Sequence, residues 1–220
     1  MRKLLFPMLA LLGLLAAPVR AESPQALVDR ATQSVRSVLG DTNFGAARAG
    51  LKRAKAVLVV PELVKAGLIV GGEGGDGVLL VKDASGAWSD PAFYMLASGS
   101  IGLQAGVEKK EVLFLIMTDL GLEKVMTNQM KLGADASITV GTVGAGAEAS
   151  TVGSAKADIV AYSKGMGLFG GGALEGGVIS PKNDWNAAYY GAGAGPRGIT
   201  LERRFSNPDA VRLKQALSAY

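Results

Sequence analysis

Two glycine-rich strings are the features of this chain that look most like ligand-binding motifs. Gly165, Gly167 and Gly170 match the GxGxxG spacing of dinucleotide-binding loops. That chemistry also needs a helix that begins at the glycines, so that its first N–H groups meet the pyrophosphate. The residues that follow read GGALEGGVI, which disfavours a helix. We therefore interpret the string as a strand bent by glycine.

The second string, at residues 71–76, reads GGEGGD and matches the core of calcium-binding β-roll repeats. Those repeats hold Ca²⁺ by stacking, because each copy completes the site of its neighbour. This chain has a single copy, so we predict a hairpin or a bulged connection between strands. We expect no metal site and no cofactor.

Acid–base chemistry would depend on carboxylates, Lys or Tyr, because the sequence has no His and no Cys. This composition excludes a Ser-His-Asp triad, thiol nucleophiles and disulfides. Nothing in the sequence makes two acids converge as a glycosidase pair would require. We interpret the acids near the expected strands as solvated turn and rim positions, and we expect no catalytic residues. These acids are Glu73, Asp76, Glu108, Glu148 and Glu175.

Basic residues gather at two places in the sequence. Such clusters are typical of a solvated face, and they equally suit the headgroups of anionic lipids. Aromatic side chains next to basic ones fit a membrane interface, although most of those in this chain favour a core position. The candidate lipid-binding residues are Lys52, Arg53, Lys55, Lys109 and Lys110; the neighbouring large apolar residues are Trp88, Phe93, Tyr94, Met95, Phe169 and Trp185.

The elements that must position these residues change from helical to extended along the chain. Apolar residues three and four apart predict a helix over 25–39, and a second short helix is expected at 44–54. Residues 56–117 have β character, and 112–117 should form a central buried strand. Further strands are expected at 133–149, 156–162 and 168–180, and helices at 119–128, 183–190 and from Asn207-Pro208 onward.

The fold class that follows is α+β, with helices at the N-terminus, in mid-chain and at the C-terminus. The β core should be antiparallel, curved and glycine-rich, barrel- or sandwich-like, with about eight to ten strands. Glycine supports the curvature, because 30 of the 31 glycines follow residue 21 and most alternate with apolar residues. Glycine inside a strand marks bulges, bends and close backbone approach.

Residues 1–21 have the pattern of a cleaved secretory signal peptide. Arg2 and Lys3 precede an apolar run that is shorter than a membrane span, and Val19 and Ala21 suit a cut before Glu22. Removing this segment leaves 20 basic against 19 acidic residues, which argues against a nucleic-acid partner. We expect residues 22–220 to form a single domain that is exported to the periplasm or cell envelope, or secreted.

Several strings occur together in an order that resembles the SYLF domain family. The most specific are Lys65-Ala66-Gly67, Gly86-x-Trp88, Gly106-x-Glu108, Tyr162-Ser163-Lys164 with Gly167-Leu168-Phe169, and Leu174-Glu175-Gly176. The resemblance covers roughly residues 35–191. It implies a lipid-binding module rather than an enzyme, since eukaryotic members bind phosphoinositides and some bind actin filaments.

The chain departs from that family in two respects. Its expected export would separate it from actin and from cytosolic phosphoinositides. The expected first helix carries only Arg30 and Arg36 against Asp29, which is a weak basic face. We therefore expect binding of anionic phospholipid at a membrane surface and no actin binding, with a structural, protein–protein assembly role as the alternative. The sequence leaves the oligomeric state open.

Overall fold

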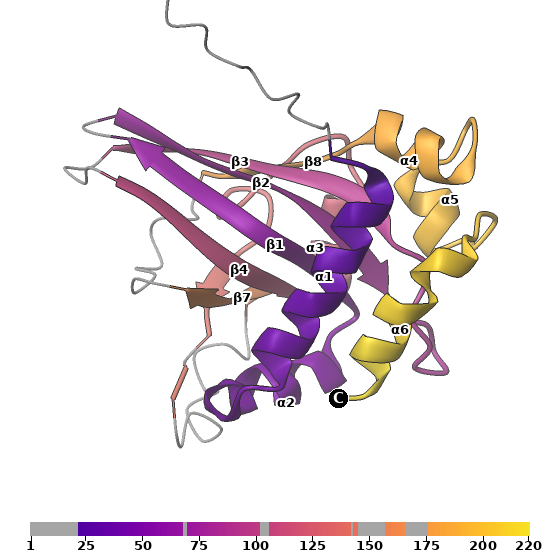
Figure 1. Cartoon of the computed structure of the whole chain (residues 1–220), viewed down its shortest axis with the longest axis horizontal. Helices are drawn as coiled ribbons and strands as arrows, with labels where there is room; N and C mark the ends of the chain where they lie inside the picture. The colour runs from indigo at the N-terminus through magenta and orange to yellow at the C-terminus, as the bar shows by residue number, and fades with distance from the viewer. Residues whose placement is uncertain (1–21, 68–69, 102–105, 142, 145–156, 166–175) are drawn as a thin grey trace, which may run out of the picture.

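A computed structural model describes residues 22–67, 70–101, 106–141, 143–144, 157–165 and 176–220 (Figure 1). The signal-like segment 1–21 lies outside these ranges. Within them, no helix is both long enough and apolar enough to cross a bilayer. The α-helices are α1 (Pro24–Leu39), α2 (Gly45–Arg53), α3 (Asp119–Val125), α4 (Asn183–Tyr190), α5 (Pro196–Thr200) and α6 (Val211–Ser218).

Eight strands form one sheet, which confirms the α+β class. The sheet order is β5-β8-β3-β2-β1-β4-β7-β6, and all neighbours are antiparallel except β6 and β7. The two short strands β5 and β6 lie at the edges. The strands are β1 (Ala56–Gly67), β2 (Val70–Val81), β3 (Ala92–Ile101), β4 (Gly106–Ile116), β5 (Met130–Lys131), β6 (Ile138–Val140), β7 (Ile159–Gly165) and β8 (Val178–Pro181).

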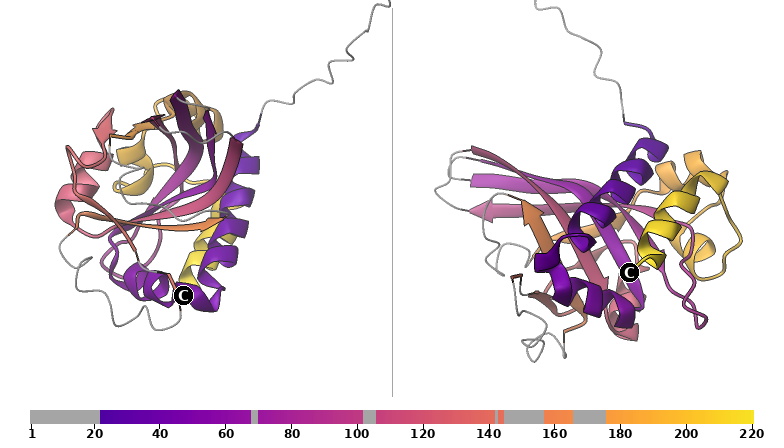
Figure 2. Two further views of the ribbon diagram at one scale, coloured as in Figure 1. Left: turned by 90° about the vertical axis from the view of Figure 1, so that its left-hand side faces the viewer. Right: turned by 60° about the horizontal axis from the view of Figure 1, so that its bottom comes forward.

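The sheet has a separate apolar core on each of its faces. On one face, α1, α2 and α6 pack over alternate residues of the strands, such as Val57 and Leu115. The intervening residues, such as Leu58 and Phe114, face a second core that also receives α3, α5 and side chains of β5 and β8. Figure 2 shows the sheet curling around this second side, which we call the concave face.

A β-bulge in β1 bends the sheet and changes which side chains face inward. The register of β1 shifts between Val59 and Val64 against β2 and between Val60 and Leu63 against β4, so β1 contains one extra residue. Pro61 lies at the shift, where a missing N–H is tolerated. On β2, a Cβ at Gly75 would collide with the carbonyl oxygen of Glu62. Glycine at this position therefore makes room for the bulge.

The structure shows that our prediction for residues 71–76 was wrong. The GGEGGD string is neither a hairpin nor a connection, because it lies inside β2, which runs without a break from Val70 to Val81. The glycines that resemble a turn sequence instead let β2 approach the bulged strand. On the neighbouring strand, β1 continues through Pro61 to Gly67.

Most other elements lie close to where the sequence places them. The helices at 25–39, 44–54 and 183–190 correspond to α1, α2 and α4, and Ser23 caps α1 by accepting a hydrogen bond from the Ala26 N–H. Only 138–140 of the expected 133–149 strand is extended among the described residues. Much of the expected 168–180 strand, up to residue 175, lies outside them. The parallel pairing of β6 with β7 and the short helix α5 were not predicted.

Asp158 joins three elements that are distant in sequence. Its carboxylate accepts hydrogen bonds from the hydroxyl of Thr118 (2.5 Å) and from the hydroxyl and N–H of Ser137 (2.6 and 2.9 Å). Thr118 in turn caps α3 by accepting from the Gly121 N–H. These donors, first that of Ser137, lower the pKa of Asp158 below its ordinary value.

We predict that Asp158→Asn lowers the free energy of unfolding by about 1–2 kcal/mol at pH 7, since charge-assisted hydrogen bonds to a partly exposed group are lost. A carboxyl with a lowered pKa stabilises the fold above its unfolded pKa, near 4, and this contribution is lost as the pH falls through the folded pKa. Urea unfolding at pH 7 and pH 3 should therefore show a smaller difference between variant and wild type at the lower pH. An equal difference at both values would contradict this role.

Candidate functional site

Three of the five predicted basic residues lie together at the C-terminal end of α2. Lys52 and Arg53 are exposed in its last turn, and neither forms an ion pair among the described residues. Lys55 follows at the start of β1, where its N–H donates to the carbonyl of Ile116. The ammonium of Lys55 pairs with Asp119 at 2.8 Å, which holds the beginning of α3 beside α2. We call Lys52, Arg53 and Lys55 the α2 basic cluster.

Two adjoining hollows open beside this cluster. One, of about 410 Å³, lies between Arg48, Lys52 and Tyr220, at the end of α6. The other, of about 280 Å³, is lined on one side by Lys82 and Trp88. Lys52 and Tyr220 line both hollows, so together they form one shallow cleft between α2, the β2–β3 connection and α6. We call it the α2–α6 cleft.

Lys82 fixes one wall of the cleft to the end of α2. Its ammonium donates to the carbonyls of Leu51 (2.7 Å) and Lys52 (3.2 Å), which are among the last carbonyls of the helix. The Leu51 carbonyl also accepts from the N–H of Ala54, which follows the helix. The same nitrogen lies 4.7 Å from the centre of the Trp88 ring, a cation–π contact. Burial lowers the pKa of Lys82.

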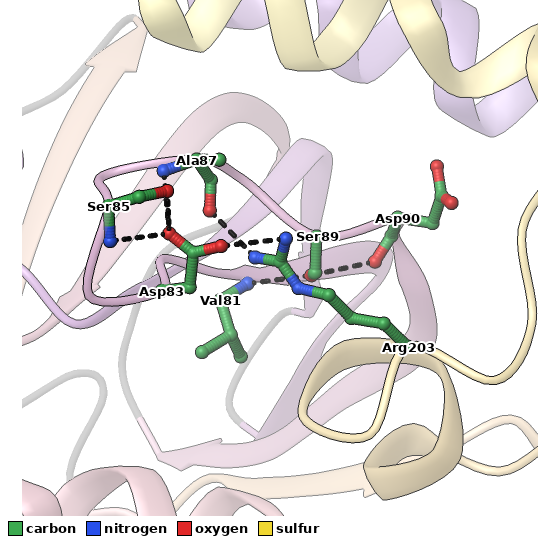
Figure 3. A network of polar contacts seen from close by, with 7 residues as sticks. All are labelled: Val81, Asp83, Ser85, Ala87, Ser89, Asp90 and Arg203. Carbon is green, nitrogen blue, oxygen red and sulfur yellow. Dashed lines mark hydrogen bonds and ion pairs between the residues drawn. The ribbon is translucent and has the colours of Figure 1, made fainter.

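The turn between Lys82 and Trp88 is held by a polar network (Figure 3). One carboxylate oxygen of Asp83 accepts from the N–H and hydroxyl of Ser85 and from the N–H of Ala87. The other oxygen pairs with Arg203 at 2.8 Å, and Arg203 also donates to the Ala87 carbonyl. The segment before α6 therefore fixes the turn. Gly86, at φ 86°, occupies a position that favours glycine.

Sequence reasoning missed Arg48 and Lys82 as parts of this site. Arg48 lies four residues before Lys52, and that spacing places both on one face of a helix. Its guanidinium donates to the carbonyls of Leu39 (2.9 Å) and Asp41 (2.7 Å), at the end of α1. Both missed side chains are therefore bonded to carbonyls at helix ends. Among the basic residues that line the cleft, this leaves Lys52 exposed, with Arg53 exposed next to it in the same helical turn.

The other two predicted residues lie elsewhere. Lys109 and Lys110 are on β4, opposite Val64 and Leu63 of β1, which are nine and eight residues along the strand from Lys55. At about 3.3 Å per residue, this separates them from the α2 basic cluster by roughly 25 Å. Lys109 is exposed and pairs with Glu62 at 2.9 Å. Lys110 is buried on the concave face and pairs with Glu108 at 3.1 Å. The five residues therefore form no single surface.

The remaining candidate residues are also distributed over the sheet. Gly165 ends β7, whereas Gly167, Gly170, Glu148 and Glu175 lie outside the described residues. Asp76 pairs with Lys182 at 2.6 Å. Glu73 and Glu108 share the concave face, but Lys65 of β1 lies between them. No group of three acidic side chains that could hold a metal occurs in the described part of the chain.

The large apolar side chains near the basic residues are mostly core residues. Trp88, Phe93 and Tyr94 are buried, and Trp185 packs edge-on against Phe93. Tyr94 also donates to the Val125 carbonyl, and burial raises the pKa of its hydroxyl. Phe169 lies outside the described residues. The apolar residue exposed next to the α2 basic cluster is Leu120, which directly follows Asp119 on α3 and is 48% exposed.

Comparison with known proteins shows to which family this sequence is similar. Residues 97–220, more than half of the chain, match the sequence profile of the Ysc84 family, described as "Las17-binding protein actin regulator". The chain belongs to this family. The match confirms the resemblance to the SYLF domain, and the names found across the family are those of binding or adaptor proteins.

Relatives match over most of this chain but over a minor part of their own length. LAS seventeen-binding protein 3 of Saccharomyces cerevisiae is 32% identical over 164 residues, which cover 73% of this chain and 35% of that protein. Protein YSC84 of the same yeast is 32% identical over 144 residues, or 64% and 31%. The human SH3 domain-containing YSC84-like protein 1 is 27% identical over 134 residues, or 60% and 39%.

The family supports a binding module at a coarse level. The chain spans about a third of the length of the relatives it matches, which have room for further parts that this chain does not cover. The description of the family as an actin regulator gives no support to our exclusion of actin binding.

We predict that Lys82→Met destabilises the fold by about 1–2 kcal/mol, because the Lys52 carbonyl loses its side-chain donor and the Leu51 carbonyl loses one of its two donors. Lys52→Met is the matched control, since it removes an exposed lysine of the same cleft and should change stability by less than about 0.5 kcal/mol. Thermal or urea unfolding monitored by circular dichroism measures both. Equal stability of the two variants would show that the contacts of Lys82 do not hold the cleft.

Proposed function

We propose that this chain is an exported, non-catalytic module that binds anionic phospholipid at the α2 basic cluster and the adjoining cleft. The observation that carries the proposal is the exposure of Lys52 and Arg53 in one helical turn without an ion-pair partner among the described residues. Exposed cations of this kind gain about 1 kcal/mol each near an anionic membrane surface.

The surroundings of the cluster favour a surface rather than a deep ligand pocket. The cleft is shallow and its inner cations, Arg48 and Lys82, are bonded to helix carbonyls. A headgroup would therefore meet Lys52 and Arg53 first. Leu120 could enter the interface beside them, since the Lys55–Asp119 pair holds α3 next to α2. The buried state of Trp88, Phe93 and Tyr94 assigns them no part in insertion.

Vesicle co-sedimentation tests the proposal. Residues 22–220 should bind vesicles containing phosphatidylglycerol and not vesicles of phosphatidylcholine alone, and binding should weaken as salt is raised from 50 to 500 mM. The double variant Lys52→Met/Arg53→Met should bind roughly 10–30-fold more weakly, because two charges near the surface are lost.

The control is the double variant Lys131→Met/Arg197→Met, which removes two exposed charges from β5 and α5. It has the same net charge as the first variant, so it should bind like the wild type. Equal weakening of the two variants would mean that net charge, and not the α2 basic cluster, drives binding. Equal binding to neutral and anionic vesicles, or no binding to either, would contradict the proposal.

Export and the choice of partner are separate parts of the proposal. Expression in a bacterial host followed by fractionation should recover a protein that begins at Glu22 outside the cytoplasm; a full-length cytoplasmic product would refute export. Because the family is described as an actin regulator, filament co-sedimentation belongs in the same series. A stable oligomer that binds neither vesicles nor filaments would favour the assembly role.

A further inference from the structure

A row of polar side chains crosses the concave face near the far ends of β1 to β4. Glu73 of β2 is directly opposite Ser98 of β3 and Lys65 of β1, and Lys65 is directly opposite Glu108 of β4. Direct partners in an antiparallel pair point to the same face, about 5 Å apart. We call Ser98, Glu73, Lys65 and Glu108 the concave row.

The face on which the row lies follows from the strand parity. Glu73 alternates in step with Leu79 of the concave core, and Glu108 alternates in step with Val112. Lys65 faces the same side because the extra residue in β1 reverses the alternation of side chains beyond the bulge. In Figure 1, these strands extend to the left beyond α1 and α6.

Glu73 is the unusual member of the row. It is only 4% exposed, and within the described part of the chain neither of its carboxylate oxygens has a hydrogen-bond partner. An ionised carboxylate is costly in such a place, because it has lost water and gained no donor. Burial is the main cause that raises the pKa of Glu73, and Glu108 adds to it, while Lys110 and Lys65 act in the opposite direction.

Lys110 lies next to the row and interacts with two of its acids, Glu108 and Glu73. It is 7% exposed and its ammonium pairs with Glu108 at 3.1 Å. It also acts electrostatically on Glu73, more strongly than Lys65 does. Among the described residues, the charged groups facing Glu73 are therefore Lys65 from β1 and Lys110 and Glu108 from β4, with the hydroxyl of Ser98 on β3.

We propose that Glu73 is the titrating group of a switch built into the concave face. Protonated, it lies neutral in the row while Lys110 pairs with Glu108. Ionised, it competes with Glu108 for Lys110 and draws Lys65 toward itself, which loosens the ends of β1 to β4. The switch is independent of the α2 basic cluster, which lies at the opposite end of these strands.

The sign of the pH effect follows from proton binding. When a carboxyl has a higher pKa in the folded than in the unfolded state, the folded state binds more protons between the two values. Stability therefore falls as the pH rises through that window, and it changes no further above the folded pKa. One such group can change the unfolding equilibrium by at most tenfold per pH unit.

The decisive comparison is between wild type and Glu73→Gln, which keeps the size of the side chain and removes its titration. Urea unfolding of residues 22–220 at several values from pH 4.5 to 8 should show that the variant becomes progressively more stable than the wild type as the pH rises. Asp76→Asn is the matched control, on the same strand and the opposite face, and its difference from wild type should stay constant over that range, because the substitution leaves the concave row unchanged.

Hydrogen exchange supplies a second readout that does not depend on global unfolding. After correction for the intrinsic pH dependence of exchange, the amides of Lys65, Glu73 and Lys110 should be less protected at pH 8 than at pH 5 in the wild type. They should be equally protected at both values in Glu73→Gln. A difference between wild type and Glu73→Gln that does not vary with pH, in stability or in protection, would overturn the switch.

Discussion

The bulge in β1 is the constraint on which the rest of the structure depends. In a regular strand the side chains would alternate without interruption from Ala56 to Gly67, and Leu63 and Lys65 would then face the side opposite to Leu58. The extra residue near Pro61 changes the parity once, so that Leu63 and Lys65 face the same side as Leu58. The price is a distorted backbone, which glycine on the neighbouring strand accommodates.

This single irregularity divides the sheet into two regions with different chemistry. In the part covered by α1, α2 and α6, both faces are apolar and buried, which is the condition for a stable core. Beyond the bulge, the concave face carries charged groups, of which Glu73 and Lys110 are buried. A charge there must be paired or neutral. Among the described residues, Glu73 is the buried carboxylate of this face whose two oxygens both lack a hydrogen-bond donor.

The opposite end of the sheet follows a different principle. There, basic side chains satisfy the carbonyls at the ends of α1 and α2, because a helix leaves its last carbonyls without partners. Arg48 and Lys82 perform this task, and the neighbouring Lys52 and Arg53 remain exposed. Structural and accessible cations thus lie side by side at one site. The membership in the Ysc84 family agrees with a binding role for such a surface at a coarse level.

The sequence by itself determined the local elements, the α+β class and the family. The expected helices at 25–39, 44–54 and 183–190 agree with α1, α2 and α4 within one or two residues, and the first of them was located by the spacing of its apolar residues, which depends on neighbours in the chain. The prediction of a hairpin or connection at residues 71–76 was wrong. In a sequence, a glycine that makes room for a bulge on a neighbouring strand cannot be distinguished from a glycine in a turn. The tertiary structure alone decided which charges meet. It separated Lys109 and Lys110 from the α2 basic cluster and set Glu73 beside Lys65, because strand register joins residues through pairing rather than through sequence proximity.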